Sequence, residues 1–513
     1  MKKLVTLLTL AALIVAMLVA ASASAESATT YNGHDISEYV TLNMFAIADA
    51  PLDQKKADEY FAVLNAYLKE KLNCGINYVY ASGTDYTNNY MLAMASGEKY
   101  DLVHAGNWLT YTTYADKGAY MPLDSLIEEY APYVWEQAAD KWDGVRVNGT
   151  IYGVPTLRGD RVEYAFFYRE DLRKKYGCPE INSIDAIETY LLAIKENEPD
   201  LLPSDDTQAM VYGNTFIPLN KYQIVDTMGG MNSNFVIDPS NPHELLNTIE
   251  LPEYKEYMYT MKRFYDEGLW PKDQLSRNGW GVMSVTSGKA AASFVGQFWN
   301  YAYLIPQTEG EHPDWELNYA PYCLMNPEES VVPAADPTGA LLAVSRTADN
   351  PERALMLIDL AHQDETLWRL MYYGLEGVHY TITEDGKVDE SLLADPVKDK
   401  FNYFPGTLFD DPKFYLEKAD QWEGQTALVE QINALIQPNV LEGFVIDWSN
   451  VDVEYTMLNE VRTTVGNPMH VGAVDDVDAY YESYVEQSKA AGLDTIHDEI
   501  QRQLDEFLNA KGI

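Results

Sequence analysis

The chain has 513 residues, and its 79 acidic side chains against 36 basic ones give a formal net charge of −43. A field of that sign repels nucleic acid and anionic lipid, so we exclude nucleic acid as a partner. Because single hydrophobic cores stop growing at about 250–300 residues, at least two lobes are expected.

The first 25 residues have the order of a secretory signal peptide. Lys2 and Lys3 precede a nearly unbroken apolar run at residues 4–20, and the small residues 23–25 follow it. This order predicts cleavage after Ala25 and a secreted, cell-surface or periplasmic location. The alternative is a retained membrane helix, because the run approaches the ~20 residues that a span needs. No cysteine lies nearby, so no lipid anchor is expected there.

The sequence contains no recognisable catalytic or metal-binding motif. It has no glycine-rich nucleotide loop, no zinc-protease motif and no serine-hydrolase motif. The cysteines are far apart, which argues against a metal site and leaves at most one disulfide: Cys74, Cys178 and Cys323. We therefore expect neither a cofactor nor a metal, and no enzymatic activity.

The first part of the exported chain alternates the patterns of strands and helices. Strands are predicted at residues 40–45, 76–80 and 100–103, and helices at residues 52–72 and 86–96. The third strand runs into the loop 104–108. This alternation is typical of a parallel sheet covered by helices.

Later segments extend the same pattern. Asn148-Gly149 is a strong signal for a hairpin turn within residues 147–155. Asn350 and Pro351 suit the N-cap and first position of a helix that continues to residue 362. Further strands are predicted at residues 165–168 and 341–344, and further helices at residues 170–176, 184–197, 253–267 and 496–508.

Several segments, in their order and spacing, carry a resemblance to a known family. They are MLAMASGEKYDLVHAGNW (91–108), KGAYMPLDSLIEEYAP (117–132), VNGTIYGVPTLRGDRVEYAFFYREDLRKKYG (147–177), SGKAAASFVGQFWN (287–300), NPERALMLIDLAHQDE (350–365) and FVIDWSNVDVEYTMLNEV (444–461). With these segments the chain resembles the extracellular solute-binding proteins of ABC importers, the group that includes maltose-binding protein. It resembles most the subgroup with a DUF3502-type C-terminal region.

The resemblance implies an α/β fold of two hinged lobes, the periplasmic-binding-protein fold of type II, with extra C-terminal helices. Each lobe would be a mainly parallel sheet flanked by helices. Lobe 1 would comprise residues 36–156 and 336–380, and lobe 2 residues 157–335 and 381–513. The function implied is capture of a small solute, preferably an oligosaccharide, in the cleft between the lobes. A monomer would then deliver the solute to ABC permease subunits.

Ligand-binding candidates follow from where ligands bind in such folds, at the carboxyl ends of parallel strands. The loops after the first and third strands carry Asp49, Asn107 and Trp108. A flat indole can stack on the apolar face of a sugar ring, while carboxylates and amides accept its hydroxyl groups. The alternative for Trp108 is packing in a core or an interface between lobes.

The other candidates follow from the resemblance. Phe298 and Trp299 occupy the aromatic position of the second lobe, with plain packing as the alternative. Arg158 and Glu163 flank the first crossing between lobes, and Arg158 could instead form an inter-lobe salt bridge. The weaker candidates are Trp280, Asp336 at the second crossing, and Glu376.

Other functions remain open from the sequence. Within the same class, a peptide or another polar organic solute could replace the oligosaccharide. A secreted glycoside hydrolase or lyase would use similar aromatic side chains but needs two carboxylates positioned at the scissile bond. A surface sensor or adhesin on the same scaffold is the third possibility.

Overall fold

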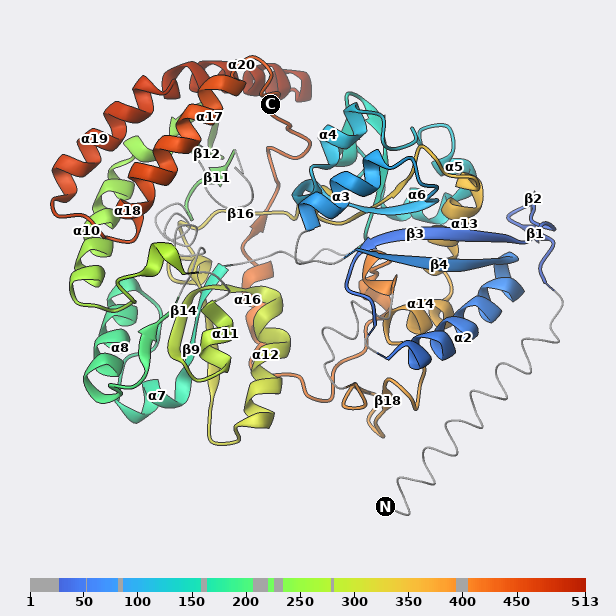
Figure 1. Ribbon diagram of the computed structural model, residues 1–513, viewed down its shortest axis with the longest axis horizontal. Coiled ribbons are helices and arrows are strands. Elements are labelled where there is room, and N and C mark those ends of the chain that lie inside the picture. Colours follow the sequence, from blue (N-terminus) through green and yellow to red (C-terminus); the bar gives the residue numbers. More distant parts are fainter. Residues whose placement is uncertain are drawn as a thin grey trace. The chain divides into compact units, whose positions relative to one another are not determined.

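The computed structural model describes residues 27–51, 53–81, 86–157, 164–205, 220–225, 234–277, 281–393 and 405–513. The chain divides into two compact units, each built from two stretches of sequence (Figure 1). Unit 1 comprises Met1–Gly159 and Asp336–Asp420, and unit 2 comprises Asp160–Ala335 and Gln421–Ile513.

Unit 1 contains a five-stranded sheet in the order β4-β3-β5-β17-β8. The strands are β3 (Val40–Ile47), β4 (Cys74–Ala81), β5 (Leu102–Ala105), β8 (Gly153–Pro155) and β17 (Leu341–Val344). Strands β3, β4 and β5 are parallel, whereas β17 is antiparallel to both β5 and β8. The amino end of β17 therefore lies at the carboxyl ends of the other four strands.

Helices cover this sheet as the strand–helix alternation predicts. Helix α2 (Gln54–Leu72) is capped by Asp53, whose carboxylate accepts from the backbone of Lys56. Its buried stripe is Tyr60, Leu64, Leu68 and Leu72. The other helices are α3 (Tyr86–Ala95), α4 (Tyr111–Asp116), α5 (Ile127–Tyr130), α6 (Pro132–Gln137), α13 (Pro351–Ala361) and α14 (Glu365–Tyr372). Short hairpins are formed by β1 (Thr30–Tyr31) with β2 (His34–Asp35), β6 (Arg146–Val147) with β7 (Thr150–Ile151), and β18 (Thr381–Ile382) with β19 (Val388–Asp389).

Asn350 holds the N-cap position of α13, but its side chain makes no capping hydrogen bond. Its backbone N–H instead donates to the carboxylate of Asp101, which also accepts from the backbone of Asn43. The sequence therefore predicted the N-cap position of Asn350 correctly. It did not predict the capping interaction, because the carboxylate of Asp101, distant in sequence, binds at that end of the helix.

Residues 381–420 belong to unit 1 in the structure, whereas the sequence analysis assigned them to the second lobe. Phe409 is fully buried in the core of unit 1. The Trp368 indole donates to the Phe409 carbonyl at 3.0 Å, and the ring of His362 contacts the Asp411 carboxylate at 3.2 Å. These buried contacts attach the segment to α13 and α14.

Unit 2 contains a four-stranded sheet in the order β10-β14-β9-β15. Its strands are β9 (Tyr164–Arg169), β10 (Leu202–Ser204), β14 (Ala290–Gln297) and β15 (Leu317–Pro321). Strand β9 is antiparallel to both β14 and β15, whereas β10 and β14 are parallel, so the sheet is mixed and not mainly parallel as expected. Its main helices are α7 (Glu170–Lys175), α8 (Ile184–Asn197), α10 (Pro252–Asp266), α11 (Gly281–Thr286) and α12 (Phe298–Glu311).

The C-terminal helices complete the core of unit 2. Helix α20 (Leu493–Lys511) buries Ile496, Ile500, Leu504 and Leu508 on one face, the spacing expected from the sequence. This face shares a core with the three-stranded sheet of β11 (Gln223–Ile224), β12 (Phe235–Asp238) and β13 (Asn241–Asn247). Figure 1 shows α20, α19 (Val477–Ala490) and α17 (Asp452–Val461) on the side of unit 2 that carries β11 and β12. Shorter elements are α16 (Gln425–Asn433), α18 (Asn467–His470), β16 (Val332–Pro333) and β20 (Ile436–Gln437).

The three cysteines are buried and free of disulfide bonds. Within the described ranges, no helix has both the length and the apolar character that a membrane crossing demands. The same ranges hold no group of three or more His, Cys, Asp or Glu side chains that could bind a metal ion.

A buried histidine joins the C-terminal region to α10. His470 shares a hydrogen bond with the Tyr254 hydroxyl, and its side chain is buried. Burial, and to a smaller extent the positive charge of Arg462, lower the pKa of His470 to about 3. The imidazole is therefore neutral in the folded chain at neutral and mildly acidic pH.

This burial predicts a loss of stability in acid. The unfolded chain protonates His470 near pH 6.5, but the folded chain does not until about pH 3, so the free energy of unfolding falls as the pH drops between these values. The His470→Gln variant should lose about 1.4 kcal/mol per pH unit of this slope below pH 6. Urea unfolding at pH 4.5–7 measures the slope. His312→Gln is the control, and an equal slope in wild type and His470→Gln would contradict the assignment.

Candidate functional site

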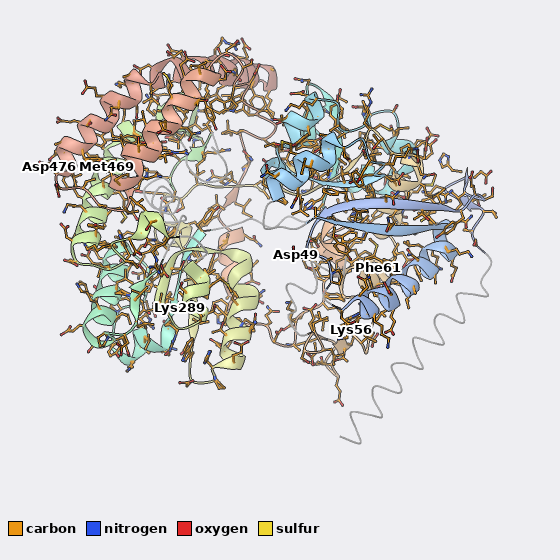
Figure 2. All side chains as sticks on the ribbon, viewed as in Figure 1. Asp49, Lys56, Phe61, Lys289, Met469 and Asp476 are labelled. Carbon is orange, nitrogen blue, oxygen red and sulfur yellow. The ribbon has the colours of Figure 1, made fainter. Side chains whose placement is uncertain are left out.

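Four of the predicted site residues lie at one edge of the unit 1 sheet. Asp49 follows β3 (Figure 2), and Asn107 and Trp108 follow β5. Asp336 precedes β17, whose antiparallel direction brings its amino end to this same edge. All four side chains are exposed. The edge therefore gathers residues from three separate segments of the chain, as ligand sites of open α/β sheets do.

The Trp108 side chain is exposed but fixed in position. Its indole N–H donates to the Gly339 carbonyl at 3.2 Å, and 42% of the residue is accessible to solvent. Gly106 makes this position possible, because a Cβ there would lie 2.8 Å from the indole nitrogen and 3.2 Å from the Gly339 oxygen. The indole is thus held against the backbone on one side while part of it faces solvent.

Asn107 and Asp336 lie next to the indole and link the same two segments. The Asn107 Oδ1 accepts from the backbone N–H of Trp108 at 2.7 Å, and its Nδ2 contacts Asp336 Oδ2 at 3.4 Å. Asp336 Oδ1 accepts from the backbone and hydroxyl of Thr338. Among the described residues, Oδ2 receives only the long Asn107 contact, so this oxygen retains acceptor capacity for a ligand.

His104 packs edge-on against Trp108, with the ring centroids 5.2 Å apart. Burial lowers the pKa of His104 to about 4, so the imidazole is neutral under physiological conditions. A neutral ring supports the indole without adding a positive charge beside Asp336. The edge therefore combines one supported aromatic surface with carboxylate and amide acceptors, a chemistry suited to a ligand with an apolar face and hydroxyl donors.

Glu376 comes from a separate segment of unit 1. It is exposed in the turn after α14, where it forms a backbone bridge with Tyr380. The ring of His379 in this turn packs edge-on against Tyr60 of α2. The role of Glu376 in the site stays a prediction.

The second-lobe candidates are placed by their backbone alone. Phe298 and Trp299 are the first two residues of α12, directly after β14, and their side chains lie outside the described set. At this end of β14, Gln297 pairs with Tyr164. Three further candidates lie outside the described residues: Arg158, Glu163 and Trp280.

Sequence analysis missed the residues that hold the indole. Gly106 lets the indole lie close to the backbone, and Gly339 supplies the carbonyl that accepts its hydrogen bond. Neither role is indicated by a local sequence pattern. His104 was assigned to the loop, whereas it belongs to β5, which covers residues 102–105 instead of 100–103. The strand extends this far because Ala105 and His104 pair with Leu341 and Leu342 of β17. The sequence alone predicted only the chemical character of the loop, its aromatic and amide side chains.

An exposed aromatic side chain fixed at the carboxyl edge of an α/β sheet fits a protein that binds a solute. The chain belongs to the bacterial extracellular solute-binding proteins, because residues 49–365 match that family. Residues 440–509 match a domain of unknown function, DUF3502. Both parts of the resemblance drawn from the sequence are thereby confirmed, and so is the α/β fold class.

Known proteins resemble the chain over nearly its whole length. It is 24% identical over 490 residues, 93% of each chain, to a carbohydrate ABC transporter substrate-binding protein of Streptococcus pneumoniae. The crystal structure of the N-glycan transport solute binding protein NgtS from the same organism matches with a TM-score of 0.74 and 22% identity, covering 92% of this chain and 100% of that one. The alginate-binding protein AlgQ2 matches with a TM-score of 0.66 and 19% identity, covering 94% and 100%.

The Gly106→Ala variant tests how the indole is held. The added Cβ has no backbone penalty at this extended residue but collides with the indole nitrogen, so the hydrogen bond to Gly339 should break. Hydrogen exchange of the Trp108 indole proton, followed by NMR, should become about threefold to tenfold faster.

Gly310→Ala is the matched control, since a Cβ there meets nothing within 4 Å. The Trp108→Phe variant identifies the indole resonance. If Gly106→Ala and Gly310→Ala leave the exchange rate equally unchanged, Gly106 does not set the position of the indole.

Proposed function

We propose that the protein is exported and binds an oligosaccharide at the carboxyl edge of the unit 1 sheet, for delivery to an ABC importer. The observation that carries the proposal is the exposed Trp108 indole, hydrogen-bonded to Gly339 and flanked by the carboxylate of Asp336. Family membership supplies the solute-binding class.

The geometry favours a sugar over a purely apolar solute. A pyranose ring has one face of C–H groups, which packs on an indole, and a rim of hydroxyl groups, which donate hydrogen bonds. Asp49 and Asp336 are exposed acceptors at this edge, and the Asn107 side chain contacts both the backbone N–H of Trp108 and the Asp336 carboxylate. The net charge of −43 disfavours an anionic ligand, so a neutral glycan is preferred.

The names of similar proteins support the same ligand class. The pneumococcal relative is described as a carbohydrate transporter component, and NgtS has been crystallised in complex with Man1GlcNAc. A Bifidobacterium longum infantis protein with a TM-score of 0.63 and 16% identity is described as HMO binding. A peptide or another polar organic solute is the second candidate within the same class.

A thermal-shift screen separates these ligands. A solute that binds only the folded chain raises the melting temperature, and at one hundred times Kd the stabilisation is about 2.7 kcal/mol. Neutral oligosaccharides should raise Tm, while peptides of similar size should not. If only peptides raise Tm, the ligand is a peptide and not an oligosaccharide.

A glycoside-active enzyme is the alternative from another class. Such an enzyme would need two carboxylates about 5–9.5 Å apart around a glycosidic bond. Incubation with the glycans that shift Tm, followed by product analysis, tests this function directly. Release of cleavage products would show that the protein is an enzyme and would contradict the proposal that it binds its ligand unchanged.

Export and partners form the rest of the proposal. We expect cleavage after Ala25, a monomer in solution, and contact with the permease subunits of an importer. The mass of the secreted protein reports the cleavage site, and light scattering reports the oligomeric state. An uncleaved N-terminus in the membrane fraction would favour the retained helix.

Replacing the indole should weaken ligand binding without unfolding unit 1. In Trp108→Ala the stacking surface is lost, so the Kd for the oligosaccharide identified in the screen should rise tenfold to hundredfold, equivalent to about 1.4–2.8 kcal/mol. Isothermal titration calorimetry measures the change. The control is Leu92→Ala, which removes another exposed apolar side chain of unit 1. If the Kd of Trp108→Ala equals that of the wild type, the indole is not part of the binding site.

A further inference from the structure

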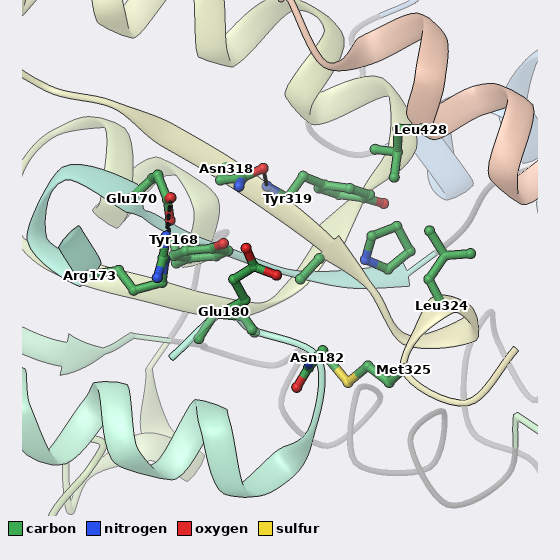
Figure 3. Close-up of a pocket in the computed structure, with 13 residues that line it drawn as sticks. Tyr168, Glu170, Arg173, Glu180, Asn182, Asn318, Tyr319, Leu324, Met325 and Leu428 are labelled. Atoms are coloured by element: carbon green, nitrogen blue, oxygen red, sulfur yellow. Dashed lines mark hydrogen bonds and ion pairs between the residues drawn. The ribbon is translucent and has the colours of Figure 1, made fainter. Parts of the chain in front are cut away.

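A pocket in unit 2 is lined by none of the predicted site residues. It has a volume of about 280 Å³ and runs beside the edge strand β15 (Figure 3). Its floor is apolar and comes from β15, the turn that follows it, α16 and the loop before α8: Ile181, Ala320, Pro321, Leu324, Met325 and Leu428. Polar side chains at its rim include Glu170, Arg173 and Glu180.

The charges at the rim are not balanced. Both oxygens of Glu170 accept from Arg173 at 2.5 Å, so this carboxylate is neutralised. Glu180 is exposed, and among the described residues its carboxylate makes no hydrogen bond and no close ion pair; it acts on Arg173 only through longer-range electrostatics. Figure 3 shows its carboxylate reaching toward the middle of the lining side chains, away from the Glu170–Arg173 pair. One negative charge therefore stands over an apolar floor.

An added β-strand is not a suitable occupant. The backbone donors of β15 that face away from β9 are at alternate residues 317, 319 and 321. Leu317 already donates to Glu309 at 2.9 Å, Tyr319 donates to the Asn318 side chain at 2.8 Å, and Pro321 has no N–H. The edge is closed in the way that proteins prevent strand addition, so the occupant is held by side-chain contacts.

The size and chemistry of the pocket fit one long side chain. A volume of about 280 Å³ is slightly below the ~300–1,000 Å³ of sites for drug-sized molecules. An aliphatic stem that ends in a cation matches an apolar floor below an unpaired carboxylate. No metal-binding group of side chains occurs in the described ranges, which argues against a free divalent cation.

We propose that this pocket receives a lysine or arginine side chain from a partner protein, and that the partner is the membrane part of the importer. The second statement rests on the proposed function. A second copy of this chain is a poor partner, because 79 acidic residues against 36 basic ones make two copies repel each other.

The pocket can be tested without the importer. N-acetyl-lysine amide is titrated into the whole chain while the methyl resonance of Met325 is followed by NMR, with Met325→Leu to identify the signal. The wild-type signal should shift, and N-acetyl-norleucine amide, which has the stem but not the charge, should shift it at least threefold less at equal concentration. Glu180→Gln should abolish the difference. An unmoved Met325 signal would overturn the proposal.

Uptake by cells tests the partner. Glu180→Lys reverses the charge, and Ala320→Leu fills the pocket without changing charge. Both variants should bind the glycan with a Kd within twofold of wild type but reduce its uptake about tenfold. Glu196→Lys, on an exposed face of α8, is the control with the same change in net charge and should transport normally.

The results distinguish the two proposals. If Glu180→Lys and Ala320→Leu transport as well as Glu196→Lys, the importer is not the partner and the inference fails. If the wild-type chain binds no glycan at all, the proposed function fails, while the Met325 titration still decides whether the pocket accepts a basic side chain.

Discussion

The hydrogen bond between the Trp108 indole and the Gly339 carbonyl joins residues 231 positions apart. It exists because β17 runs antiparallel between β5 and β8, so that the segment before β17 arrives where β5 ends. This one strand direction places Asp336 beside Asn107 and gives the indole a rigid support. A tryptophan on a loop without that support would lose conformational freedom on binding, which lowers affinity.

The DUF3502 region is part of the core of unit 2. Helix α20 buries five aliphatic residues in the same cluster as Phe235 and Leu245, and the His497 ring contacts the Leu245 carbonyl at 2.9 Å. The three-stranded sheet of β11, β12 and β13 would expose an apolar face without these helices. These C-terminal helices therefore have a packing role in unit 2.

The acidic character of the chain connects the two proposals. At the unit 1 edge, exposed carboxylates and a neutral His104 favour a ligand that donates hydroxyl hydrogen bonds and carries no negative charge. At the unit 2 pocket, the unpaired Glu180 favours a cationic side chain. The same excess of carboxylates thus favours a neutral solute at one site and a basic protein partner at the other, because the side chains that line the two sites differ.

Local patterns determined much of this protein. Alternation and helical spacing located β3, α2, β4, α3 and α20, since those periodicities depend on neighbours within a few residues. The loop chemistry also identified Asn107 and Trp108. Tertiary structure alone decided that Gly339 meets Trp108, that residues 381–420 join unit 1, and that β15 borders a pocket. These features depend on pairing and packing between segments that are tens to hundreds of residues apart, and no short-range pattern encodes which distant segments become neighbours.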